Sequence, residues 1–107
     1  MTIAPKSQML SLTDLVGYQE GSIVSRVIVK SDAGNVTLFA FDGGQELSEH
    51  TAPFDALAHV LEGEAEIRIA GQPFSLKAGE AIIMPANQPH AVRAAKQFKM
   101  LLTMVRA

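Results

Sequence analysis

The sequence predicts an all-β fold, an antiparallel sandwich or barrel of short strands. Short runs rich in Val, Ile, Phe and Thr alternate with turns that contain glycine or proline. These turns recur at near-regular spacing, which is typical of sheets that wrap around and so limit their exposed edges. A chain of 107 residues suits one domain with a single core.

The expected elements follow in order along the chain. Residues 11–18 could form a helical turn, with Ser11 or Thr13 as its cap. We expect an N-terminal arm over residues 1–22 and a single barrel domain over residues 23–107. The expected strands of that domain span residues 23–30, 36–41, 47–52, 57–61, 65–70, 74–76, 81–85, 90–94 and 98–105.

Stripes of period two predict which side chains face the core. Successive side chains of a strand point to opposite faces, so every second residue lies on the same face of the sheet. Glu66 and Arg68, for example, fall on the polar side of their strand. The apolar stripes are Ala65, Ile67 and Ile69; Phe98, Met100, Leu102 and Met104; and either Phe39 with Phe41 or Leu38 with Ala40.

Composition excludes several classes of partner. The chain is 48% hydrophobic and 19% charged, and its net charge of −2 offers no basic surface for nucleic acid. It has no cysteine, hence no disulfides or thiolate metal ligands. No apolar run approaches the roughly 18 residues that would span a bilayer, and the N-terminus lacks the apolar core of a signal peptide. We expect a cytoplasmic protein with no membrane partner.

Two glycine-led motifs carry the strongest functional signal. The first reads Gly44-QELSE-His50-Thr-Ala52-Pro-Phe-Asp55-Ala56-LAHVLE-Gly63. The second reads Gly79-EAIIM-Pro85-Ala-Asn87-Gln-Pro-His90-AVR-Ala94. In order and spacing they resemble the paired motifs of the small single-domain cupins, which are similar to RmlC.

The resemblance covers roughly residues 23–105 and implies a cupin-type double-stranded β-helix, a jelly-roll barrel with a site inside its mouth. Members of this family usually hold a divalent metal there with two histidines and a glutamate from the first motif and a histidine from the second. They commonly form homodimers, so the resemblance also implies a homodimer.

The ligand set departs from the family pattern. His50 and His90 occupy metal-histidine positions of the resembled motifs. Ala52 replaces the second histidine of the first motif and Ala56 its glutamate, and Ala94 replaces the asparagine that ends the second motif. A catalytic first-row metal usually needs three protein ligands. The three alanines leave either a repacked interior or an apolar cavity beside the histidines.

Asp55 and His59 are the candidates for a third ligand. Asp55 lies one residue before the glutamate position and could reach inward if the backbone bulges, or it could accept hydrogen bonds from nearby backbone N–H groups. Alternation places His59 opposite residue 56, on the outer sheet face or in a dimer contact, unless a bulge reverses it. His50 and His90 could also be structural, each donating to a backbone carbonyl.

Two readings of function lead, and the sequence leaves open whether the protein is an enzyme. The first is a dimeric barrel that binds a small, mostly apolar or aromatic molecule through His50 and His90. It could also hold a weak Zn, Ni, Fe or Mn ion, or none. Ser48, which alternation puts on the face of His50, and Met100, whose thioether adapts to irregular apolar space, would join the ligand site.

The second reading is a cupin metalloenzyme of the dioxygenase, isomerase or decarboxylase type, with Asp55 or His59 completing the metal site. A third reading is metal-free acid–base chemistry, which the sugar-epimerising relatives of this fold use. That chemistry needs a positioned partner, and the single tyrosine, Tyr18, lies outside both motifs.

Overall fold

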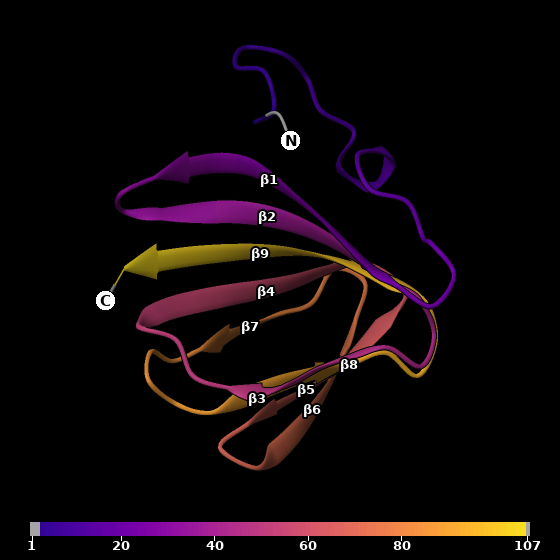
Figure 1. Ribbon diagram of the computed structural model, residues 1–107, viewed down its shortest axis with the longest axis vertical. Coiled ribbons are helices and arrows are strands. Elements are labelled where there is room, and N and C mark those ends of the chain that lie inside the picture. Colours follow the sequence, from indigo (N-terminus) through magenta and orange to yellow (C-terminus); the bar gives the residue numbers. More distant parts are fainter. Residues whose placement is uncertain (1–2, 107) are drawn as a thin grey trace.

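The computed structural model describes residues 3–106, which fold into two antiparallel sheets packed face to face (Figure 1). Residues 1–2 and 107, the ends of the expected arm and barrel domain, lie outside the described residues. The strands are β1 (Ile23–Ser31), β2 (Gly34–Phe41), β3 (Glu46–His50), β4 (Phe54–Glu62), β5 (Glu64–Ile69), β6 (Gln72–Lys77), β7 (Ala81–Met84), β8 (His90–Arg93) and β9 (Phe98–Arg106). The predicted all-β jelly-roll fold is confirmed.

The strand order shows how the chain wraps. The larger sheet has the order β1-β2-β9-β4-β7 and the smaller sheet the order β3-β8-β5-β6. Strand β9 lies between β2 and β4, so the last strand occupies the centre of the larger sheet (Figure 1). Strand β8 pairs with both β3 and β5 and joins the two motif-bearing parts of the chain.

The main core lies between the two sheets. The predicted stripe of β9 points into it, and Phe98 stacks on Phe41 with ring centroids 4.5 Å apart. Phe39 and Phe41 face this core, whereas Leu38 and Ala40 are buried on the opposite side of β2. Both alternatives for β2 therefore pack against a core, with Phe39 partly buried, because the larger sheet is covered on two faces. Each large apolar side chain buried in this way contributes about 1.5–3 kcal/mol.

The N-terminal arm covers the outer face of the larger sheet. Ala4 and Val16 of the arm are buried against Leu38, Ala40 and other residues of β1 and β2. The expected helical turn is a 3₁₀ turn, η1 (Leu12–Asp14), with Ser11 at its N-cap position. The Ser11 side chain makes no cap hydrogen bond to the backbone, and its hydroxyl donates to the Asp14 carboxylate instead. No helix in the described part of the chain is long and apolar enough to cross a bilayer.

Polar contacts fasten the end of the arm to the sheet. The Tyr18 hydroxyl donates to the Glu62 carboxylate at the end of β4. Lys99 Nζ donates to the Thr13 carbonyl and lies 5.1 Å from the centroid of the Tyr18 ring. Burial and the Glu62 carboxylate raise the pKa of Tyr18 well above its ordinary value, so the hydroxyl stays protonated and keeps donating.

Candidate functional site

The structure brings His50 and His90 together at one end of the smaller sheet. They are the last residue of β3 and the first residue of β8, and they form a cross-strand pair. Their ring centroids lie 4.4 Å apart in an edge-to-face arrangement. His90 is 8% exposed, whereas His50 is exposed, so the pair extends from the interior to the surface.

An irregularity in β3 sets the direction of His50. The pairing of β3 with β8 shifts between Leu47 and His50, as at a β-bulge. Leu47 packs against the main core and His50 pairs with the buried His90. Strict alternation predicted that Ser48 shares the face of His50, but the bulge changes the phase and the Ser48 side chain is exposed.

Each histidine is anchored through Nδ1 to a backbone carbonyl two residues earlier. His50 Nδ1 lies 2.8 Å from the Ser48 oxygen, and His90 Nδ1 lies 3.2 Å from the Gln88 oxygen. A carbonyl oxygen only accepts, so Nδ1 of each neutral imidazole carries the hydrogen and Nε2 carries the lone pair. The contact of Ser48 with His50 is therefore made by the Ser48 backbone carbonyl.

The environment of His90 favours its neutral form. Burial lowers the pKa of His90 below its ordinary value, and the neighbouring His50 lowers it further. The hydrogen bond to the Gln88 carbonyl opposes this shift in part. His90 is therefore an uncharged imidazole at neutral pH.

The loop between β7 and β8 positions His90. Asn87 in this loop has a φ of 64°. Asparagine is one of the few residues other than glycine that adopts this left-handed conformation readily. The Asn87 N–H donates to the Ala52 carbonyl at 2.8 Å, which ties the loop before His90 to the segment after His50.

Asp55 does not join the histidine pair. It is exposed, while the adjacent Ala56 is 4% exposed and packs into the main core. Its carboxylate accepts a hydrogen bond from the Ala86 N–H at 2.9 Å. The register shift of β4 falls between Val60 and Glu62, beyond Asp55, so no bulge turns this side chain inward.

His59 also lies away from the pair. Its neighbours Ala58 and Val60 are fully buried in the main core, so His59 points to the outer face of the larger sheet. There it lies across from Leu101 of β9, which packs in the cluster beneath the arm. Alternation predicted this orientation.

The donor set does not fit a tightly held metal. No group of three or more His, Asp or Glu side chains within residues 3–106 converges on a point where it could hold one ion. His50 and His90 alone supply two nitrogen ligands, fewer than a catalytic first-row metal usually has. Loss of a ligand weakens a site because water replaces its coordination energy only in part.

Apolar side chains surround the positions of the missing ligands. Ala56 pairs with Met84 of β7 on one side and with Met104 of β9 on the other. Ala94 is fully buried in the main core. Met100 is also fully buried and pairs with Val60, four residues along β4 from Ala56 and therefore deeper in the barrel.

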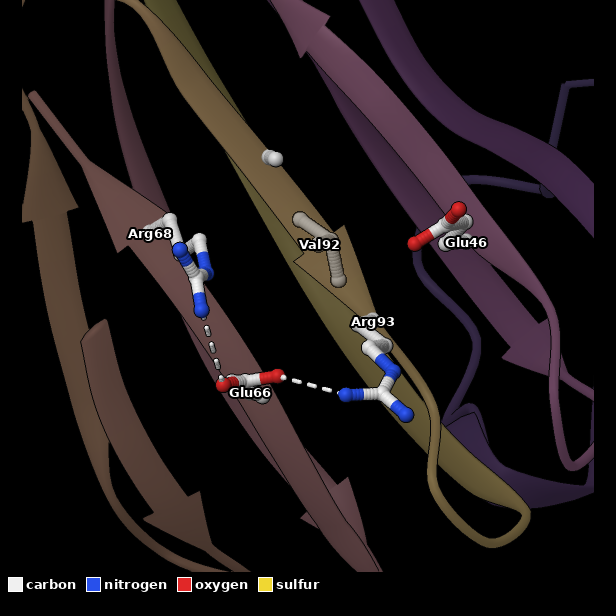
Figure 2. Close-up of a pocket in the computed structure, with 6 residues that line it drawn as sticks. Glu46, Glu66, Arg68, Val92 and Arg93 are labelled. Atoms are coloured by element: carbon white, nitrogen blue, oxygen red, sulfur yellow. Dashed lines mark ion pairs between the residues drawn. The ribbon is translucent and has the colours of Figure 1, made fainter. Parts of the chain in front are cut away.

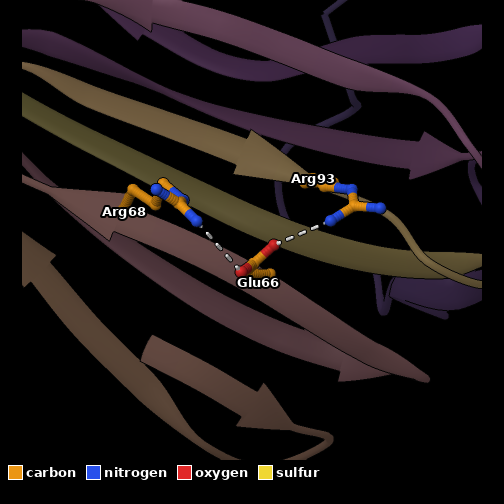
Figure 3. A network of polar contacts seen from close by, with 3 residues as sticks. All are labelled: Glu66, Arg68 and Arg93. Carbon is orange, nitrogen blue, oxygen red and sulfur yellow. Dashed lines mark ion pairs between the residues drawn. The ribbon is translucent and has the colours of Figure 1, made fainter. Parts of the chain in front are cut away.

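A charged hollow, which the sequence did not predict as a site, lies on the outer face of the smaller sheet. It has a volume of about 370 Å³ and contains Glu46, Glu66, Arg68 and Arg93 (Figure 2). Glu66 forms ion pairs with Arg93 at 3.6 Å and with Arg68 at 3.9 Å (Figure 3). Alternation predicted that Glu66 and Arg68 face outward, but the pairing of β5 with β8 that adds Arg93 is not readable from local sequence. Exposed pairs of this kind contribute little to stability.

Comparison with known proteins gives the family and several structures of similar fold. Residues 37–106 match the protein family described as "Cupin domain". A conserved Streptococcus pyogenes protein of unknown function superposes with a TM-score of 0.91 at 34% identity, covering 100% of this chain and 96% of that one. A cupin superfamily protein from Desulfitobacterium hafniense has a TM-score of 0.91 at 29% identity, covering 99% and 97%.

Two further relatives are longer than this chain. A cupin 2 conserved barrel domain protein from Leptotrichia buccalis is 44% identical with a TM-score of 0.88, covering 91% of this chain and 47% of that one. The polyketide synthase CurC of Streptomyces cyaneus is 27% identical over 73 residues, which are 67% of this chain and 47% of that protein. The chain therefore spans about half the length of each of these two relatives.

Proposed function

The chain belongs to the cupin family, whose domain it matches over residues 37–106, and on that premise we propose that it binds a small molecule at the barrel mouth through His50 and His90. One observation carries this proposal. Both imidazoles are anchored through Nδ1 to backbone carbonyls, which leaves both Nε2 atoms as oriented polar contacts. Precise polar groups beside an apolar wall are the usual make-up of a small-molecule site.

The surroundings of the pair favour a mostly apolar ligand. Ala52 and Ala56 replace polar residues of the family pattern, and Met84 and Met104 flank Ala56. Thioether side chains adapt to ligands of irregular shape. The likeness to CurC, a protein named as a polyketide synthase, agrees with a small organic ligand.

The proposal includes at most a weakly bound metal. His50 and His90 could hold a Zn, Ni, Fe or Mn ion as two nitrogen ligands, and ligand binding does not depend on that ion. The metalloenzyme alternative needs Asp55 or His59 as a third ligand. Both side chains face away from the pair, so no observation favours that alternative.

A homodimer is part of the proposed function, as the family resemblance implies. A row of apolar side chains crosses the outer face of the larger sheet beyond the arm. Val29, Leu57 and Ile83 of this row are 56%, 40% and 62% exposed. Contiguous exposed apolar side chains are common at protein contact sites, and we assign this row to the contact between two copies.

The binding proposal is tested with the three single-histidine variants. We expect a thermal-shift screen of small neutral aromatic molecules to find compounds that raise the Tm of the wild type and of H59F. The same compounds should raise the Tm of H50F and H90F by clearly less. Compounds that stabilise all four proteins equally would contradict a site at the pair.

Metal content gives an independent test. Elemental analysis of the protein as purified should find less than one equivalent of transition metal, which dialysis against a chelator removes. Stoichiometric metal that resists chelation, lost in D55N or H59F, would support the metalloenzyme alternative instead.

A further inference from the structure

With both rings neutral, the histidine pair offers hydrogen-bond acceptors and no donors to a ligand. The hydrogen on Nδ1 of His50 is used by the Ser48 carbonyl, and that of His90 by the Gln88 carbonyl. In a neutral imidazole the other nitrogen then bears a lone pair. The two Nε2 atoms of this site therefore both accept.

The interior behind the pair supplies no positive charge. Among the described residues the buried polar side chains are Thr37 and His90. The Thr37 hydroxyl donates to Asn35. Arg93, on the same strand as His90, and Arg68, on the neighbouring strand β5, point to the outer face of the smaller sheet, where they pair with Glu66 (Figure 3).

From this arrangement we infer the chemical class of the ligand: a neutral molecule that donates from a hydroxyl group to His50 and His90 and has an apolar body, such as a phenol. This inference rests on the proposed function, that a small molecule binds at the pair. The inference specifies that the ligand donates the hydrogen bonds and the histidines accept them. The family fold does not specify this, because it follows from the two Nδ1 hydrogen bonds in this chain.

The same arrangement disfavours carboxylates and phosphates. An anion brings only acceptor oxygens, which would face two nitrogen lone pairs and no cation. Moving such a charge out of water without a compensating partner is costly. A hydroxyl group instead replaces its bond to water by a bond to Nε2, and a net hydrogen bond of this kind changes affinity by about three- to tenfold.

The tautomer of each imidazole tests the inference without any ligand. The full chain is labelled with ¹⁵N and studied by NMR at about pH 8, where an ordinary imidazole is neutral. We expect His50 and His90 to show a protonated Nδ1 and an unprotonated Nε2, with H50F, H59F and H90F assigning the signals. A protonated Nε2 on both rings would overturn the inference, whatever the protein binds.

Three matched probes then test the ligand class: 2-naphthol, its methyl ether 2-methoxynaphthalene, and 2-naphthoate. We expect 2-naphthol to shift the signals of both rings and to bind about three- to tenfold more tightly than the ether, with 2-naphthoate weakest. Equal affinities, or tightest binding of 2-naphthoate, would overturn the inference and leave the proposed function standing. Binding of all three without any shift at His50 or His90 would instead refute the proposed function.

Two variants complete the experiment. H90F keeps an aromatic ring but removes its acceptor, so the preference for 2-naphthol over the ether should shrink. H59F, on the outer face of the larger sheet, is the matched control and should keep the full preference. A preference unchanged in H90F and H50F alike would place the donor elsewhere and overturn the inference.

Discussion

At the scale of single residues, His90 links the site to the stability of the fold. Its pKa is lowered in the folded protein, chiefly by burial, so the unfolded chain binds more protons than the folded one as the pH falls below about 6.5. The stability tied to neutral His90 is therefore complete above that pH. It is lost progressively as the pH falls toward the lower pKa of the folded state.

The first prediction follows from this sign. The free energy of unfolding of the wild type, measured with urea, should decrease between about pH 7.5 and pH 5.5, and H90F should decrease less. H59F serves as the control and should follow the wild type. Parallel curves for the wild type and H90F would mean that the pKa of His90 is the same in the folded and the unfolded protein.

Gly63, the last residue of the first motif, allows a sharper test of packing. Its φ is 78°, and a Cβ there would lie 2.5 Å from the Gln97 carbonyl oxygen. Gly71 has a similar φ of 82° but open space around it. Both Gly→Ala variants pay about 1–2 kcal/mol for the left-handed backbone, and only G63A also forces two backbone segments apart.

We therefore expect G63A to lower the free energy of unfolding by clearly more than G71A, measured by urea denaturation. Equal losses would show that the turn at Gly63 relaxes without cost.

The site illustrates what residue patterns predict and what they do not. Motif spacing predicted that His50 and His90 are neighbours in space, because both positions belong to a known pair of motifs. Alternation predicted the outward direction of His59, since β4 is regular at that point. Alternation did not predict the direction of Ser48, because the register shift in β3 changes which residues share a face. No residue type at positions 47–50 indicates that shift.

At the scale of elements, the N-terminal arm is part of the core. The sequence predicted an arm with one helical turn but no role for it, because the outer face of the larger sheet is not identifiable from one strand. Pairing of β2 with β9 is a long-range contact, and local periodicity carries no information on such pairings. The arm buries Val16 against this sheet and fastens itself through Tyr18 and Lys99.

The arm contact gives the third prediction. Y18F removes the hydrogen bond to Glu62 but keeps the ring under Lys99, so the free energy of unfolding should fall by about 0.5–1.5 kcal/mol. E62Q serves as the matched change on the other side. In a double-mutant cycle the two losses should not add, and additive losses would show that the two side chains do not interact.

At the scale of the whole molecule, the two outer faces differ in character. The outer face of the smaller sheet has alternating charges, with Glu46 across from Arg93 and Arg93 across from Glu66. The larger sheet has an uncharged row on its outer face instead. Each member pairs with the next across all five strands, in the order Val29, Val36, Thr103, Leu57 and Ile83.

This contrast locates the contact of the proposed homodimer. A two-fold axis through the row would place apolar side chains of one copy against the same side chains of its partner, as closed dimers require. The charged face offers no comparable apolar surface. Val29 and Ile83 lie on the edge strands, so the contact would also cover both edges of the larger sheet.

The last prediction tests this assignment. L57E places a charge near the middle of the row, so analytical ultracentrifugation should find a dimer for the wild type and a monomer for L57E. Because Leu57 is 40% exposed, the substitution should leave the fold of the single copy intact, which circular dichroism checks. S75E, on an exposed position of the smaller sheet, is the control and should stay dimeric. A dimeric L57E together with a monomeric S75E would show that the contact lies on the charged outer face of the smaller sheet.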